Sequence, residues 1–101
     1  MTHRIFVVED DALLRDAVDL ILSDAGYFIG FTGTGRGAVE AVAAFRPDLV
    51  PLDIRLPDIC GLQVLTALRD AGHQGPIVMM TADSRPDTVR DVMDRAATAI
   101  W

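Results

Sequence analysis

The chain has 101 residues, which is the length of one domain, and half of them are apolar, so one aliphatic core is expected. The formal charge of −6 argues against direct binding to nucleic acid, because a phosphate backbone requires a basic surface. The lone cysteine, Cys60, cannot form an internal disulfide, no N-terminal signal is visible, and no apolar run is long enough to cross a membrane. We therefore expect a cytoplasmic protein without a membrane partner.

The first half of the chain alternates short apolar runs with amphipathic segments. Residues 5–8 are apolar and mostly β-branched, which predicts a strand buried on both faces. Residues 13–22 repeat apolar side chains at helical spacing, and Gly26 is a suitable helix stop. Residues 27–32 predict a second strand, and residues 37–45 predict a helix that ends before a proline.

The second half continues the alternation. Residues 48–53 predict a third strand, and residues 61–71 predict a helix with one apolar face. Residues 77–81 predict a fourth buried strand, and a fourth helix is expected from Pro86 onward. Residues 99–101 begin a fifth strand.

Strands that alternate with helices predict an α/β fold with a parallel sheet and right-handed crossovers. The expected architecture is a flavodoxin-like doubly wound sheet with strand order 2-1-3-4-5, truncated at strand five. Such sheets bind ligands at the carboxyl ends of their strands. The chain is therefore expected to be a single domain over residues 1–101.

Acidic side chains follow two strands that should be neighbours in this sheet. Glu9, Asp10 and Asp11 follow the first strand, and Asp53 ends the third. Carboxylates that converge there repel one another, and a bound Mg²⁺ would relieve the repulsion. A carboxylate beside such a cation can attack a phosphoryl donor, and the hydroxyl of Thr81 could hydrogen-bond a phosphoryl oxygen.

Three segments together resemble the signature segments of bacterial response-regulator receiver domains. They are V-V-E-D-D (7–11), L-D-I-R-L-P-D-I-C-G-L (52–62) and M-T-A (80–82), in the order and at the separations typical of that family. The resemblance covers essentially the whole chain. It implies a module of a two-component phosphorelay that accepts a phosphoryl group with the help of Mg²⁺.

The resemblance assigns a role to each matching position of the predicted metal site. Asp53 matches the phosphoacceptor, which also contacts the metal, and Asp10 matches the main metal-binding acid. Glu9 matches its acidic neighbour, which often acts through water. The backbone carbonyl of Arg55 matches a further metal ligand. Asp11 is expected to cap the following helix instead.

The resemblance also assigns roles to two residues at the end of the fourth strand. Thr81 matches the switch hydroxyl that hydrogen-bonds the phosphoryl group. Ala82 matches the small residue that leaves room for it. The two histidines, His3 and His73, are expected at exposed ends of elements, with no part in the chemistry.

The C-terminus departs from the family pattern. Receiver domains carry a Lys after strand five, at a position beyond Trp101, and this chain contains no Lys at all. Ile100 occupies the position of the family's switch aromatic. The fifth helix is missing, so we expect a receiver domain incomplete at its C-terminus. Either the chain is a fragment of a longer receiver, or it forms a homodimer through the unfinished strand-five edge.

Pro51 is a further departure from the family pattern, because proline removes a hydrogen bond from a central strand. The lost bond should cost on the order of 1 kcal/mol. A bulge at Pro51 would move Asp53, which would undermine the predicted site.

The expected function is phosphoryl acceptance on Asp53 from a sensor histidine kinase or a phosphotransfer protein, with output through a downstream partner protein or a missing C-terminal segment. The chain is expected to be no enzyme in the ordinary sense, although it could catalyse its own phosphotransfer and dephosphorylation. Two alternatives remain open: a phosphorylation-independent binding module and a non-functional receiver fragment. An aspartate-nucleophile phosphatase is disfavoured, because such enzymes carry an acid where this chain has Arg55 and also need a Lys.

Overall fold

The computed structural model of the protein describes residues 3–80 and 99–100, and in them five parallel strands form one sheet in the order β2-β1-β3-β4-β5. This is the strand order predicted from the sequence. The elements are β1 (Arg4–Val8), α1 (Ala12–Asp24), β2 (Phe28–Thr32), α2 (Ala38–Phe45), β3 (Val50–Asp53), α3 (Gly61–Asp70), β4 (Ile77–Met80) and β5 (Ala99–Ile100). Each expected helix and strand within the described residues is therefore present. The helix expected after Pro86 lies outside them.

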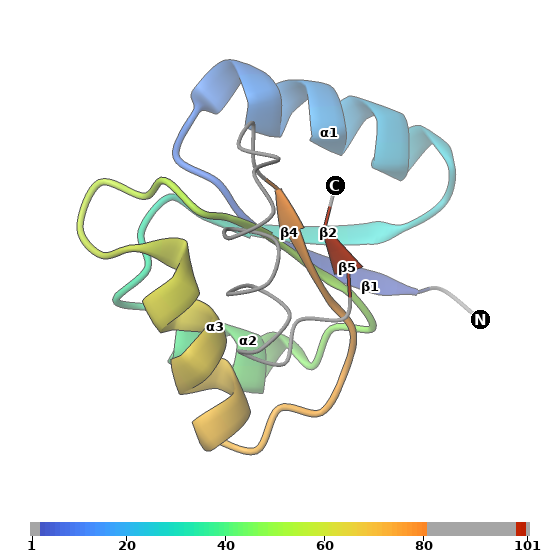
Figure 1. Ribbon diagram of the computed structural model, residues 1–101. Helices are drawn as coiled ribbons and strands as arrows, with labels where there is room; N and C mark the ends of the chain where they lie inside the picture. The colour runs from blue at the N-terminus through green and yellow to red at the C-terminus, as the bar shows by residue number, and fades with distance from the viewer. Residues whose placement is uncertain (1–2, 81–98, 101) are drawn as a thin grey trace.

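The helices cover the two faces of the sheet in separate groups. Figure 1 shows α1 on one face and α2 and α3 on the other. The handedness of the connections explains this division. The chain moves outward from β1 to β2 and then back across β1 to β3, so a right-handed crossover places α1 and α2 on opposite faces. The fold is the flavodoxin-like architecture that the alternating pattern predicts.

The main core lies between the sheet and the α2–α3 face. Alternate residues of each central strand point into it, because successive side chains of a strand face opposite sides. The helices contribute their apolar faces. The members of this core with no exposed surface are Val8, Ala38, Val50, Leu52, Val64, Leu65, Ile77 and Met79.

Helices α1 and α3 end in the same way, at a glycine in the left-handed region. Gly26 has φ +95° and Gly72 has φ +93°. The N–H of Gly26 donates to Ser23 O (3.0 Å), and the N–H of Tyr27 donates to Leu22 O (3.0 Å). These two bonds form a Schellman motif, which satisfies carbonyls at the end of the helix. The prediction that the first helix stops at Gly26 is confirmed.

Pro51 lies in the middle of β3 without a bulge. Leu49 is opposite Ile5 and Leu52 is opposite Val8 on β1, which is the same register on both sides of the proline. The N–H groups of β3 alternate in direction, and that of Val50 donates toward β4, to Pro76 O at 3.1 Å. The nitrogen of Pro51 therefore faces β1. Because this nitrogen carries no hydrogen, one hydrogen bond between β3 and β1 is missing. The displacement of Asp53 that a bulge would have caused does not occur.

The α1 face is packed more loosely than the opposite face. No residue of α1 is buried, and Leu13, Leu20 and Ile21 are largely exposed. A cavity of about 240 Å³ lies between α1 and the strands and is lined only by apolar residues. Its lining consists of Ile5, Val18, Ile21, Leu22, Leu49, Pro51, Val78 and Met80. In the part of the chain that is described, no helix is long and apolar enough to span a bilayer.

The expectation that His73 is exposed is wrong. The residue is half-buried after α3, and its Nε2 atom has no contact with solvent and no hydrogen-bond partner. Burial, together with the charge of Arg69, lowers the pKa of His73. His3, by contrast, is exposed as expected.

Candidate functional site

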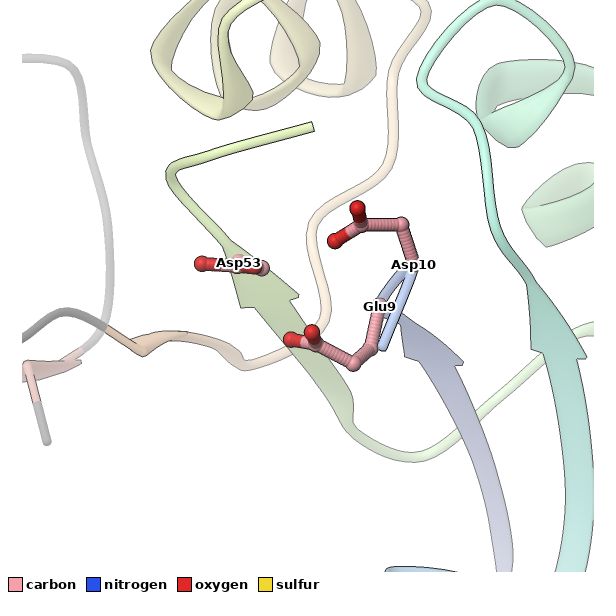
Figure 2. Close-up of side chains that lie close together, drawn as sticks. All are labelled: Glu9, Asp10 and Asp53. Atoms are coloured by element: carbon pink, nitrogen blue, oxygen red, sulfur yellow. The ribbon is translucent and has the colours of Figure 1, made fainter. Parts of the chain in front are cut away.

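Three carboxylates meet at the carboxyl edge of the sheet. Glu9 and Asp10 follow the end of β1, and Asp53 is the last residue of β3. Figure 2 shows the three side chains together at this edge. One carboxylate oxygen of each lies within 4.8 Å of the others. The sequence-based prediction that these strand ends converge is therefore correct, because β1 and β3 pair directly in parallel.

Glu9 is the buried member of the cluster, with 3% of its surface exposed. Its Oε1 accepts a hydrogen bond from the N–H of Asp11 (3.1 Å). Burial raises the pKa of Glu9 to about 7, and the neighbouring Asp53 and Asp10 add to the rise, although the Asp11 N–H opposes it. Within the described residues, the causes of this shift include no positive charge.

Asp10 and Asp53 are more accessible than Glu9. Asp10 is exposed and Asp53 is partly exposed, so both can be reached from solvent. The N–H of Arg55 donates to Asp53 Oδ1 (3.1 Å), which fixes one oxygen of that carboxylate against the following loop. The metal-ligand role predicted for the Arg55 carbonyl stays a prediction.

Asp11 has a different role from its two neighbours. Its Oδ1 accepts from the N–H of Leu13 (2.9 Å) and of Leu14 (3.3 Å) and thereby caps the first turn of α1. Such a cap satisfies donors that a helix start leaves free. The prediction that Asp11 is a helix cap is confirmed.

The position of Asp53 is set by backbone packing on two sides. Asp53 is in register with Met80 of β4. Gly61, the first residue of α3, lies so close that a Cβ there would overlap the carbonyl oxygen of Asp53. The N–H of Gly61 also donates to Ile54 O (2.7 Å). Only a residue without a side chain allows α3 to begin directly against Asp53.

The cluster fits a hard divalent cation. Carboxylate and carbonyl oxygens are the ligands that Mg²⁺ takes in proteins, and a cation would favour the charged form of Glu9, whose pKa is raised first by burial and then by Asp53 and Asp10. Thr81 and Ala82 lie outside the described residues, so their predicted roles stay predictions.

Asp58 makes a contact that its place in the sequence does not reveal. Its carboxylate accepts from the N–H of Gly35 (2.8 Å) and from the N–H of Arg36 (2.9 Å). The bond from Gly35, with a smaller contribution from Arg36, lowers the pKa of Asp58 even though partial burial opposes this. No local signal marks such a contact, because its partners lie 22 and 23 residues earlier in the chain.

Comparison with known proteins agrees with this geometry. The family model of the response regulator receiver domain matches residues 5–100. The chain belongs to the response-regulator receiver family. The receiver domain of RstA from Klebsiella pneumoniae, solved in a BeF₃-activated form, superposes with a TM-score of 0.90 at 30% identity, over 96% of this chain and 82% of that one.

Two further relatives show the range of this family. The chemotaxis protein CheY4 of Vibrio cholerae superposes with a TM-score of 0.92 at 25% identity, over 100% of this chain and 86% of that one. The DNA-binding response regulator MtrA of Mycolicibacterium paratuberculosis is 44% identical over 94 residues, which are 92% of this chain and 40% of MtrA. The receiver chain spans 20 to 40% of the length of the curated relatives that it matches. Membership of the receiver family supports a phosphoacceptor role in two-component signalling.

Proposed function

We propose that this receiver domain accepts a phosphoryl group on Asp53 from the phosphohistidine of a sensor histidine kinase or a phosphotransfer protein. The observation that carries the proposal is the convergence of Glu9, Asp10 and Asp53 at one edge of the sheet. These side chains, with the carbonyl of Arg55, would hold Mg²⁺. The partial exposure of Asp53 supports access by a donor, and the burial of Glu9 suits a supporting role behind it.

In the proposed transfer, a carboxylate oxygen of Asp53 attacks the phosphorus and forms an acyl phosphate. The bond from phosphorus to the donor's imidazole nitrogen breaks, and that nitrogen keeps the electron pair. Mg²⁺, when held by these residues, would neutralise the negative charge on the oxygens of the transferring group. The bond from the Arg55 N–H holds one oxygen of Asp53 toward the loop, which leaves the other oxygen to attack. The hydroxyl of Thr81 would hydrogen-bond the phosphoryl group on Asp53, and the small side chain of Ala82 would leave room for it.

The output would be a shift between two conformations that a downstream partner protein distinguishes. The domain would act as a phosphoacceptor that catalyses its own modification, and not as an enzyme that turns over a separate substrate. We place its action in the cytoplasm, where histidine kinases present their phosphohistidine.

The test is the intact mass after incubation with acetyl phosphate and Mg²⁺. The unmodified sequence should gain one phosphoryl group, and Asp53→Asn should gain none. Asp48→Asn is the matched control, because the carboxylate of Asp48 also accepts a hydrogen bond from a backbone N–H, but at the opposite end of the sheet. It should be modified like the unmodified sequence. A folded protein that gains no mass would contradict the proposal and favour the phosphorylation-independent module.

A further inference from the structure

The β3–α3 loop (54–60) and the β2–α2 loop (33–37) are joined by one side chain. The carboxylate of Asp58 accepts one hydrogen bond at Oδ1 from Gly35 and one at Oδ2 from Arg36. Both donors are successive backbone N–H groups, an arrangement that commonly holds anions. The glycine-containing loop therefore binds a carboxylate that belongs to the protein itself.

The contact is partly buried and, at Gly35, tightly packed. The Asp58 side chain is 17% exposed, and the Arg36 side chain, 78% exposed, lies alongside it with Nε 3.8 Å from Oδ2. Gly35 is buried, and a Cβ there would lie 2.5 Å from Ile59 Cγ1 and 2.7 Å from Val64 Cγ2. The two loops are thus in contact at Gly35 through both packing and hydrogen bonds.

The loop that Asp58 anchors begins at the phosphoacceptor. The loop is fixed at its start by the bond from the Arg55 N–H to Asp53 and by the bond from the Gly61 N–H to Ile54. Asp58 fixes it on the far side of Arg55. The backbone between Asp53 and Asp58 is therefore held from both ends, and the Arg55 carbonyl lies within this stretch.

We infer that Asp58 is a positioning residue of the site, which holds the β3–α3 loop against the β2–α2 loop and thereby sets the place of the Arg55 carbonyl. This inference rests on the proposed function, since it assigns Asp58 a part in the same metal site. Asp58 does not contact the metal or the phosphoryl group. It acts through the backbone of the loop. Outer partners of metal ligands are known to influence affinity in this way.

The experiment is a titration of Mg²⁺ alone, followed by the ¹⁵N–¹H NMR shifts of the amides of Asp10 and Arg55. Asp58→Ala removes both acceptors and should weaken Mg²⁺ binding about tenfold, which is the lower range for outer-shell partners. Asp58→Asn keeps one acceptor oxygen, so its Mg²⁺ affinity should lie between that of Asp58→Ala and that of the unmodified sequence. Phosphorylation by acetyl phosphate should need correspondingly more Mg²⁺ to reach half its maximal rate, while the rate at saturating Mg²⁺ changes less.

Asp48→Ala is the matched control for loss of structure. Asp48 also joins two distant segments through a carboxylate, which accepts from the N–H of Arg4 (2.7 Å) at the other end of the sheet. Asp48→Ala should therefore lower the stability of the fold without changing the Mg²⁺ affinity. Unchanged affinity in Asp58→Ala, or equal losses in Asp58→Ala and Asp48→Ala, would overturn the inference. If Asp58→Ala does not fold, the same comparison is made with Asp58→Asn. Failure of the unmodified sequence to bind Mg²⁺ would instead overturn the proposed function, and the inference with it.

Discussion

Replacing Glu9 with Gln should remove a pH-dependent loss of folding stability from the metal-free protein. Burial and two neighbouring carboxylates raise the pKa of Glu9 from 4.5 to about 7. The folded chain therefore keeps this proton up to about pH 7, whereas the unfolded chain releases it near its ordinary pKa. The contribution of Glu9 to stability is full below the unfolded pKa and is lost as the pH rises through the folded pKa.

The size of the effect follows from the pKa difference. A shift from 4.5 to about 7 corresponds to roughly 3 kcal/mol at high pH, at 1.36 kcal/mol for each pH unit. Most of this, about 2.5 kcal/mol, should appear between pH 5 and pH 8. Glutamine carries no titratable proton, so Glu9→Gln should become more stable relative to the unmodified sequence by that amount over this range.

The assay is urea denaturation in EDTA at a series of pH values. Glu40→Gln is the matched control, because Glu40 is an exposed glutamate on α2, away from the cluster. It should leave the pH dependence unchanged. Added Mg²⁺ should stabilise the unmodified sequence more than Glu9→Gln, since only the former offers the third carboxylate. If the pH curves of Glu9→Gln and the unmodified sequence run parallel, the electrostatic account of the cluster is wrong.

Three further variants test other parts of the structure. Gly61→Ala should lower stability by roughly 1–3 kcal/mol, because the new Cβ overlaps the backbone of Asp53, and it should also slow phosphorylation of Asp53, measured by intact mass. Asp11→Ala should cost about 1 kcal/mol through loss of the α1 cap, with a lower urea midpoint and an unchanged Mg²⁺ affinity. Because burial lowers the pKa of His73, the stability that this residue contributes is complete above its unfolded pKa near 6.5 and falls as the pH drops below that value. His73→Gln should flatten that fall in urea denaturation, and an unchanged pH dependence would show that His73 is not buried in solution.

The sequence alone was sufficient to predict the order of the elements and the place of the acidic site. Apolar runs such as residues 5–8 and 77–81 predict strands buried on both faces, and their alternation with helices predicts a doubly wound parallel sheet, for which the order 2-1-3-4-5 was expected and is observed. Once strands one and three are neighbours, Glu9, Asp10 and Asp53 must meet, because parallel strands end at the same edge. These are local patterns combined with one rule of connection, so no side-chain contact had to be known.

The tertiary structure decided the points that depend on partners distant in the chain. Pro51 is accommodated because its nitrogen faces β1 at a single ladder position, and the direction of an N–H depends on register. His73 is half-buried at the end of α3, and Asp58 accepts hydrogen bonds from a loop that lies 22 and 23 residues earlier in the chain. Each of these outcomes is set by packing between elements, and a residue's neighbours along the chain carry no information about that packing.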